Sequence, residues 1–168
     1  GCIVTGGGEL AGRCRALRNY GSRVKYHNEV VGANSRLDEI QAGLLHVKLG
    51  FLEELNQERR EIARRYQEGL DTAFLTLPKV RPGVTSTWHQ FVIHSPHRDA
   101  LKAWLAENGI GSEIHYPIPP HLSEAYRYLG YHEGDFPITE KNAREVLSLP
   151  MFNGLHEDEQ AFVIDTIN

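Results

Sequence analysis

The dominant hydrophobic pattern of this chain lies between residues 37 and 70, where apolar side chains recur every three or four positions. Charged residues fill most intervening positions in its second half, which is typical of an amphipathic helix. One straight helix of this length would be unusual in a small domain, so we expect a bend or break at Gly50. A long amphipathic helical segment of this kind suggests that its apolar face packs against a larger domain or at a subunit interface. The stripe comprises Leu37, Ile40, Leu44, Val47, Phe51, Leu55, Ile62, Tyr66 and Leu70.

The segment before this stripe combines a short apolar run with a shorter helical pattern. Residues 2–5 are typical of a strand and are followed by three turn glycines. Residues 9–20 place apolar side chains at helical spacing, and Gly21 is a plausible stop for that helix. Residues 23–32 show no clear period, so we predict a connecting loop there.

The second half of the chain alternates between short strand-like and helix-like patterns. We expect a proline-rich connection over residues 78–87 and a helix over residues 98–108 that buries Leu101, Trp104 and Leu105. The dipeptide Asn108-Gly109 predicts a turn. Together these patterns predict an α+β fold, with helices on one face of a small, mainly antiparallel sheet. Strands are expected at residues 87–94, 112–116 and 147–149, and further helices at residues 121–129, 139–146 and 156–167.

Composition narrows the classes of protein that this pattern allows. The 168 residues are the size of one domain, and the formal net charge of -4 provides no basic stripe for a nucleic acid. No apolar run approaches the ~20 residues that span a bilayer, and the first residues lack the pattern of a signal peptide. The two cysteines suit neither a disulfide framework nor a zinc site. We therefore expect a cytoplasmic protein with no nucleic-acid or membrane partner.

The first candidate site is the sequence GANSRLDEIQ, residues 32–41, which leads into the long helical pattern. Asn34 and Arg36 follow a glycine at the expected start of a helix, where unpaired N–H groups and the helix dipole favour an anion. An ordinary structural explanation remains open. In it Asn34 or Ser35 caps the helix and Arg36 is solvated, while Asp38 and Glu39 are favourable acids of the first turn.

The second candidate site is the proline-rich sequence IHYPIPPH, residues 114–121, which contains His115, Tyr116 and His121. Prolines restrict the loop in advance, so the side chains at its edges are held at a small entropic cost. The two histidines suggest a metal only weakly, because no third ligand stands at a recognisable spacing. Alternatively, His115 fills an alternating strand position and Tyr116 is half buried.

The same segments carry a resemblance to a known family. The chain resembles the DegT/StrS-type sugar-nucleotide aminotransferases, which depend on pyridoxal phosphate and have the aspartate-aminotransferase fold. The resemblance runs in order along nearly the whole chain. It is carried by GCIVT, ALRNYGS, YHNEVVGANSRLDEIQAGLLHVKL, REIARRYQEGL, GIGSEIHYPIPPH, AYRYLGY, FPITEKNAREVLSLPMF and EDEQAFVIDTI.

The resemblance implies a division of the chain and a role for several residues. Residues 1–80 would be the end of the large domain with long interdomain or dimer helices, and residues 81–168 the small C-terminal domain. Asn34, with Arg36 beside it, would bind the cofactor phosphate in the site of the neighbouring subunit of a homodimer. His115 and Tyr116 would line the pocket for the nucleotide sugar, with His121 and His27 as further candidates.

The family's catalytic lysine lies shortly before the segment that matches residues 1–5, so we expect no Schiff-base lysine in this chain. Transamination requires that lysine to hold the cofactor and move a proton. The resemblance therefore implies the C-terminal part of an aminotransferase that acts on a nucleotide-linked keto-deoxy sugar, with glutamate as the expected amino donor. It also implies that this chain alone is inactive and free of cofactor. The alternative is a stand-alone, non-catalytic module that keeps the fold and dimerises.

Overall fold

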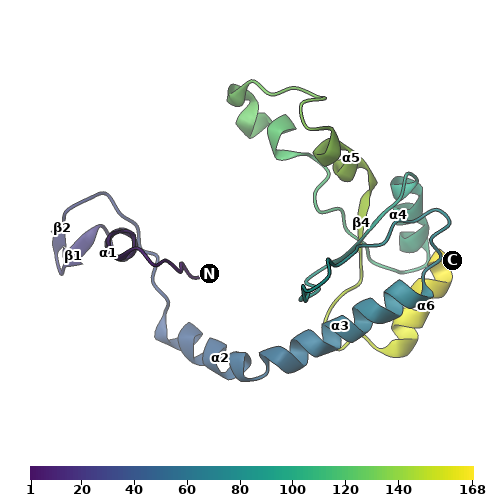
Figure 1. Cartoon of the computed structure of the whole chain (residues 1–168), viewed down its shortest axis with the longest axis horizontal. Helices are drawn as coiled ribbons and strands as arrows, with labels where there is room; N and C mark the ends of the chain where they lie inside the picture. Colours follow the sequence, from purple (N-terminus) through teal and green to yellow (C-terminus); the bar gives the residue numbers. More distant parts are fainter. The chain divides into compact units, whose positions relative to one another are not determined.

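The computed structural model describes all 168 residues, and these form two compact units, Gly1–Phe51 and Leu52–Asn168. Figure 1 labels helices and strands of both units. The architecture mixes helices with two separate two-stranded antiparallel sheets, so the predicted α+β composition is confirmed. The compact units divide earlier than residue 80, and the proposed large-domain and small-domain assignments remain predictions. No helix combines the length and the apolar composition needed to cross a membrane.

The first unit consists of α1 (Gly8–Leu17), a hairpin of β1 (Ser22–Val24) and β2 (His27–Asn28), and α2 (Glu39–Gly50). Two glycines hold its centre together by close backbone contact. A Cβ atom on Gly32 would lie 2.1 Å from the backbone nitrogen of Gly21, and one on Gly21 would lie 1.7 Å from the carbonyl oxygen of Val30. Only glycine allows such an approach, and it brings the segment that contains Asn34 beside the end of α1.

Three hydrogen bonds then fix that segment against the end of α1. The backbone of Ala33 donates to the carbonyl of Leu17 at 2.8 Å and accepts from the amide of Tyr20 at 3.0 Å. The amide of Ser35 donates to the carbonyl of Arg18 at 2.9 Å. Asn34 itself forms an isolated antiparallel bridge with Asn19. The position of Asn34 is therefore set by backbone pairing.

Several predictions for this unit were wrong. Residues 2–5 form no strand, because no other segment of the chain pairs with them. Residues 23–32, predicted as a loop, contain most of the short hairpin, and α1 ends at Leu17, earlier than expected. The next helix begins at Glu39, with Asp38 at the N-cap position, so neither Asn34 nor Ser35 caps it. The pairing of Asn34 with Asn19 keeps residues 34 and 35 outside the helix.

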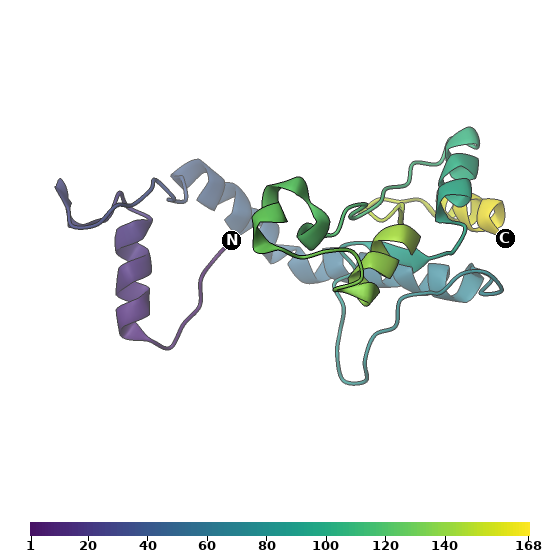
Figure 2. The same cartoon turned by 90° about the horizontal axis from the view of Figure 1, so that it is seen from above.

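The second unit is built around a long helix and one strand pair. Figures 1 and 2 show α6 (Glu157–Ile167) running beside both α3 (Leu52–Gly69) and α4 (Arg98–Glu107), and these helices are in contact. Strand β3 (Phe91–His94) pairs antiparallel with β4 (Val146–Leu149). The core between them consists of buried side chains from every layer: Ile62, Ala63, Tyr66, Leu70, Leu75, Phe91, Ile93, Leu105, Ile110, Leu147, Leu149, Leu155, Val163 and Ile167.

The chain between α4 and β4 leaves this core and returns to it. It contains the 3₁₀ helices η1 (Pro120–Leu122) and η2 (Glu124–Leu129), followed by α5 (Pro137–Glu145). The helix predicted at residues 121–129 is thus two shorter 3₁₀ segments, because Ser123 adopts an extended backbone conformation between them. The strand predicted at residues 112–116 is reduced to one bridge, from Glu113 to Ser148.

The apolar stripe of residues 37–70 falls on two helices, and only the second of them is buried. The predicted break is confirmed, since α2 ends at Gly50 and α3 begins at Leu52. The α3 part, including Ile62 and Tyr66, is buried in the second unit, whereas no residue of α2 is buried. Trp104 was expected in the core, but its side chain is 51% exposed, and its indole N–H donates to the carbonyl of Thr166 at 2.8 Å.

Candidate functional site

Asn34 and Arg36 form the first candidate site, within the first unit. Arg36 Nε donates to Asn34 Oδ1 at 3.3 Å, so the amide oxygen of Asn34 faces a cation. This contact leaves the Nδ2 group of Asn34 and the outer guanidinium nitrogens of Arg36 available as donors. The guanidinium also stands 5.7 Å from the centroid of the Tyr20 ring. Both side chains are exposed, and their free N–H groups can donate hydrogen bonds to phosphate oxygens.

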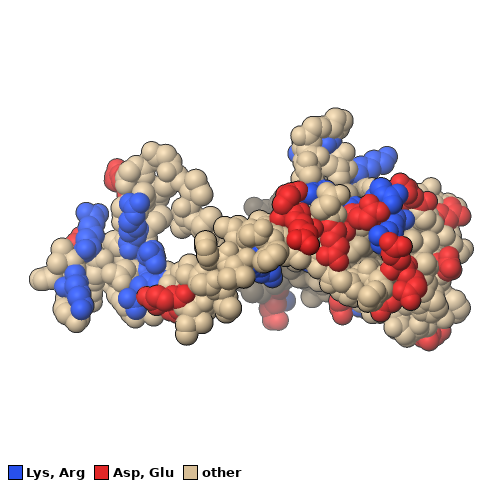
Figure 3. Space-filling model, turned by 90° about the horizontal axis from the view of Figure 1, so that it is seen from below, with Lys and Arg blue, Asp and Glu red and all other residues tan.

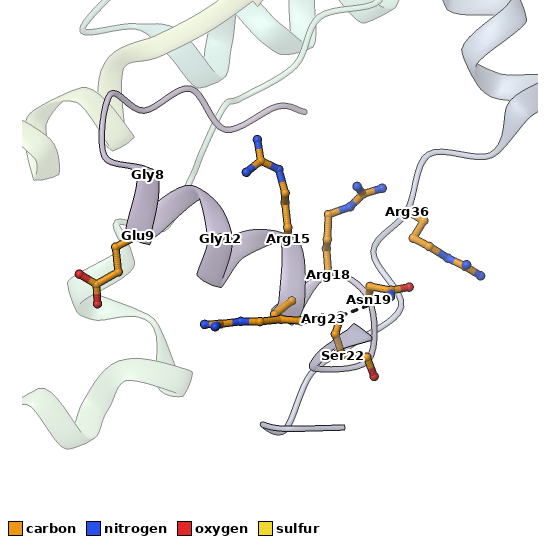
Figure 4. A pocket seen from close by; sticks show the side chains of 10 residues that line it. Gly8, Glu9, Gly12, Arg15, Arg18, Asn19, Ser22, Arg23 and Arg36 are labelled. Atoms are coloured by element: carbon orange, nitrogen blue, oxygen red, sulfur yellow. Dashed lines mark hydrogen bonds between the residues drawn. The ribbon is translucent and has the colours of Figure 1, made fainter. Parts of the chain in front are cut away.

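A cavity of about 600 Å³ lies beside this pair and is unusually rich in arginine. Figure 4 shows Arg15 of α1 and Arg18, the residue that follows α1, projecting in the same direction, with Arg36 beyond them and Arg23 on the other side. Sequence reasoning missed Arg15 and Arg18, although their spacing of three residues in a predicted helix places them on one face. Asn34 and Arg36 lie before α2 and not at its first turn, so the side chains near them that could meet an anion are guanidinium groups and not the helix N-terminus.

His27 lies in β2 and is exposed. It does not line the arginine cavity, whose wall comes mainly from α1 and from residues 19–23 and Arg36. The structure therefore places His27 in the same unit as Asn34 without bringing the two side chains into contact.

His115 occupies a second cavity, of about 270 Å³, within the second unit. Its Nδ1 atom lies 2.9 Å from Ser148 Oγ, and Ser148 is buried in β4 with its backbone paired to Glu113. A hydrogen bond at Nδ1 fixes the plane of the ring and leaves Nε2 for another partner. Tyr116 follows with a side chain that is 73% exposed and a ring edge-on to the imidazole at 5.5 Å. Sequence reasoning missed the other polar residues at this cavity: His89, Gln90, Ser112, Glu113 and Ser148.

His121 does not join His115, contrary to the expectation that one loop would present both. It is 9% exposed, and its Nε2 atom lies 3.0 Å from Oε1 of the buried Glu140. His121 lines a separate, largely aromatic cavity of about 430 Å³ together with Tyr126, Tyr131 and Phe136. The intervening prolines and η1 turn the chain, so His121 packs inward as part of a buried polar pair.

Glu140 is the acceptor at the centre of this pair. Its carboxylate accepts hydrogen bonds from the backbone of Gly134 at 2.9 and 3.0 Å and from the backbone of Phe136 at 3.2 Å. Burial raises the pKa of Glu140, but these amides and His121 together outweigh it and lower the pKa below its usual value. Glu140 therefore orders the turn before α5 as a carboxylate. No group of three or more candidate metal ligands exists in the chain.

Comparisons with known proteins match the whole length of the chain. The sequence profile of the DegT/DnrJ/EryC1/StrS aminotransferase family matches residues 1–168. The chain is 44% identical over 168 residues to dTDP-3-amino-3,6-dideoxy-alpha-D-galactopyranose transaminase from Aneurinibacillus thermoaerophilus, covering 100% of this chain and 46% of that protein. It is also 44% identical to dTDP-3-amino-3,4,6-trideoxy-alpha-D-glucose transaminase from Streptomyces venezuelae, covering 99% of this chain and 44% of the relative.

Solved structures agree with the sequence relatives. The crystal structure of DesV from S. venezuelae superposes with a TM-score of 0.92 at 44% identity, covering 98% of this chain and 44% of that one. The structure of NtdA from Bacillus subtilis, with bound cofactor PMP, gives a TM-score of 0.86 at 26% identity over 97% of this chain and 40% of that one.

The fold and the matched sequence define an aminotransferase domain of the pyridoxal-phosphate-dependent class. The chain belongs to the DegT/DnrJ/EryC1/StrS aminotransferase family. It spans less than half the length of these relatives, between 44% and 46% of the two transaminases. The donor groups of Asn34 and Arg36 suit the phosphate of such a cofactor, because both present N–H groups and neither is paired with a carboxylate.

Proposed function

We propose that this chain is the C-terminal part of an aminotransferase that moves an amino group from an amino acid, glutamate in our proposal, to a nucleotide-linked keto-deoxy sugar. The observation that carries the proposal is the unbroken family match over residues 1–168, with 44% identity to two transaminases named for dTDP-linked amino sugars. The whole protein would act in amino-sugar or polysaccharide biosynthesis in the cytoplasm.

In this proposal Asn34 and Arg36 hold the phosphate of pyridoxal phosphate in the neighbouring subunit of a homodimer. When bound, the cofactor supplies the electron sink that transamination requires. The Asn34 amide would donate from Nδ2, and Arg36 would both orient that amide through its Nε contact and add positive charge. The bridge to Asn19 supports this role, since it fixes the backbone from which the Asn34 side chain projects.

His115 and Tyr116 contact the nucleotide sugar in this proposal. Ser148 holds the imidazole through Nδ1, so Nε2 is the atom left to bind substrate. His27 is retained as a candidate beside the site, and His121 acts indirectly by ordering the chain that follows the proline-rich loop. The five lysines, Lys25, Lys48, Lys79, Lys102 and Lys141, all lie at positions that do not match the family's catalytic lysine. The chain alone would accordingly hold no covalent cofactor and catalyse no transamination.

The exposed face of α2 supports the homodimer. Its apolar side chains are open to solvent, including Ile40 at 80%, Leu44 at 69% and Val47 at 64% exposure. A contiguous apolar surface of this kind marks an interaction site. The same surface would serve the alternative function, a non-catalytic module that dimerises, so dimerisation alone does not separate the two.

Cofactor trapping separates them. Incubation of the chain and of its full-length parent with pyridoxal phosphate, followed by borohydride reduction and peptide mapping, is expected to label one lysine upstream of Gly1 in the parent and none in the chain. A stoichiometric label within the chain, for example on Lys25, would overturn the assignment of the catalytic lysine. A parent that incorporates no label would favour the non-catalytic module.

A further inference from the structure

Arg59 of α3 donates hydrogen bonds to parts of the second unit that are far from it in the sequence. Its Nη1 atom donates to the backbone carbonyl oxygens of Trp88 and His89, both at 3.3 Å, and of Met151 at 3.4 Å. Its Nε atom donates to Oδ1 of Asn153 at 3.0 Å. A guanidinium group has several N–H donors in one rigid plane, so this single side chain joins the segment before β3 to the segment after β4.

The contacts of Arg59 begin where the pairing of the two strands ends. The antiparallel register of β3 and β4 stops at Phe91 and Leu149. The carbonyl groups of Trp88, His89 and Met151 accept no backbone hydrogen bond. Carbonyl groups away from water need donors, and Arg59 supplies them here. The φ of Trp88 is 46°, a conformation that a bulky residue keeps only where surrounding contacts fix it.

Arg59 differs in this respect from its neighbours on α3. Figure 3 shows acidic and basic side chains intermixed on the second unit, the right-hand part of that view. The other three arginines of this helix are all paired with carboxylates: Arg60, Arg64 and Arg65. The adjacent carboxylate, Glu58, accepts from Nδ2 of Asn153 at 2.7 Å and from the amide of Gly154 at 2.6 Å. Two successive side chains of α3 therefore hold the segment after β4, and Arg59 alone also reaches the segment before β3.

The two segments that Arg59 joins form part of the wall of the cavity of about 270 Å³ that contains His115, which we call the His115 cavity. His89 and Met151, whose carbonyl groups bind Arg59, both line it. Arg59 does not line the cavity itself, so it acts on the wall through the backbone of these two residues.

We infer that Arg59 is a positioning residue, which fixes the distance between His89 and Met151 and with it the width of the His115 cavity for its ligand. A wall that is held in place before the ligand arrives lowers the entropic cost of binding. The identity of the ligand as a nucleotide sugar rests on the proposed function, whereas the contacts of Arg59 do not.

Steady-state kinetics of the full-length parent test the consequence for the ligand. Arg59→Gln should raise KM for the nucleotide sugar by about tenfold, because two wall residues must then be ordered on binding. The half-reaction with glutamate, followed by the absorbance of the cofactor, should be unchanged because it occurs without the sugar. An equal loss in both reactions would mean that Arg59 only supports the fold, and would overturn the inference.

Two further variants control this result. Arg60→Gln is the matched control, because it removes the same charge from the next position of α3, where the side chain contacts only Glu53 and Gln57 of the same helix. It should leave KM for the nucleotide sugar unchanged. Arg59→Lys keeps the charge but loses the planar fork, so it should give an intermediate KM. Because Arg59→Lys retains a donor for the carbonyl groups, it tests the same role if Arg59→Gln does not fold.

The single methionine of the chain, Met151, gives a readout that needs neither substrate nor cofactor. In NMR spectra of the 168-residue chain, the methyl signal of Met151 should shift or split in Arg59→Gln and keep its position in Arg60→Gln. An unmoved signal in Arg59→Gln would overturn the inference whatever reaction the parent catalyses. A signal that moves as expected, in a protein whose unmodified parent aminates no nucleotide sugar, would support the role of Arg59 and refute the proposed function alone.

Discussion

Replacement of Gly32 by alanine should detach the segment that carries Asn34 from the end of α1. The added Cβ atom would lie 2.1 Å from the nitrogen of Gly21 and 2.6 Å from the carbonyl carbon of Tyr20. Both atoms belong to the backbone and cannot move aside as a flexible side chain would. The overlap must be relieved by separating the two segments.

The expected cost follows from the contacts that separation breaks. Three backbone hydrogen bonds join residues 33 and 35 to residues 17, 18 and 20. At about 1 kcal/mol each, their loss would lower the local opening free energy by about 3 kcal/mol, or roughly a hundredfold in the opening equilibrium. Unfolding of the whole second unit is not required, since none of these contacts involves it.

Amide hydrogen exchange measured by NMR reports this opening directly. The amides of Ala33 and Ser35 should exchange roughly a hundredfold faster in Gly32→Ala than in the unmodified chain. Gly43→Ala is the matched control, because a Cβ there meets nothing within 4 Å in the interior of α2. That change should leave these amides unaffected and stabilise α2 by about 0.5–1 kcal/mol. Unchanged exchange of Ala33 and Ser35 in Gly32→Ala would refute the role given to the glycine contact.

Four further substitutions, at Asn34, His115, Ser148 and Glu140, test the remaining parts of the site. In the full-length parent, Asn34→Ala should weaken the affinity for pyridoxal phosphate roughly 10- to 150-fold, as measured by dialysis, because a charge-assisted hydrogen bond is lost. His115→Ala should keep the cofactor, and should raise KM for the nucleotide sugar or lower kcat. Ser148→Ala should raise that KM because the His115 ring loses the Nδ1 partner that orients it, and Ser148→Thr, which keeps the hydroxyl, should recover part of the effect. The pKa of Glu140 is lower in the folded protein than in the unfolded chain. The carboxylate therefore stabilises the fold above the unfolded pKa of about 4.3, and this stabilisation is lost as the pH falls through the folded pKa. Glu140→Gln should accordingly reduce the fall of the urea midpoint at acidic pH. If Glu140→Gln left the fall of the urea midpoint at acidic pH unchanged, the contacts of Glu140 would not have the role given to them. If Asn34→Ala retained the cofactor as well as the unmodified protein, Asn34 would be a purely structural residue.

The sequence predicted the elements whose pattern is local. The helices near residues 98–108 and 156–167 are observed as α4 and α6, and the break at Gly50 is observed as well. The turn predicted at Asn108-Gly109 is confirmed by the positive φ of Gly109, 75°. Periodicity and turn chemistry suffice in these cases, because each depends on neighbours along the chain.

Features that depend on distant contacts were not predictable in this way. Asn34 looks like a helix cap until its bridge to Asn19 is seen, and that bridge relies on the close approach of Gly21 and Gly32. His121 looks like a loop ligand until its buried partner Glu140 is located, 19 positions away in the sequence. Periodicity carries no signal for either pairing.

Transfer of an isotopically labelled glutamate nitrogen tests the central claim most directly. The full-length protein, loaded with pyridoxal phosphate, is incubated with labelled glutamate and a nucleotide-linked keto-deoxy sugar, and the sugar nucleotide is analysed by mass spectrometry. The account predicts that the label appears as an amino group on the sugar of at least one dTDP- or UDP-linked substrate. Label that stays in glutamate with every such sugar, in a protein shown to hold its cofactor, would contradict it.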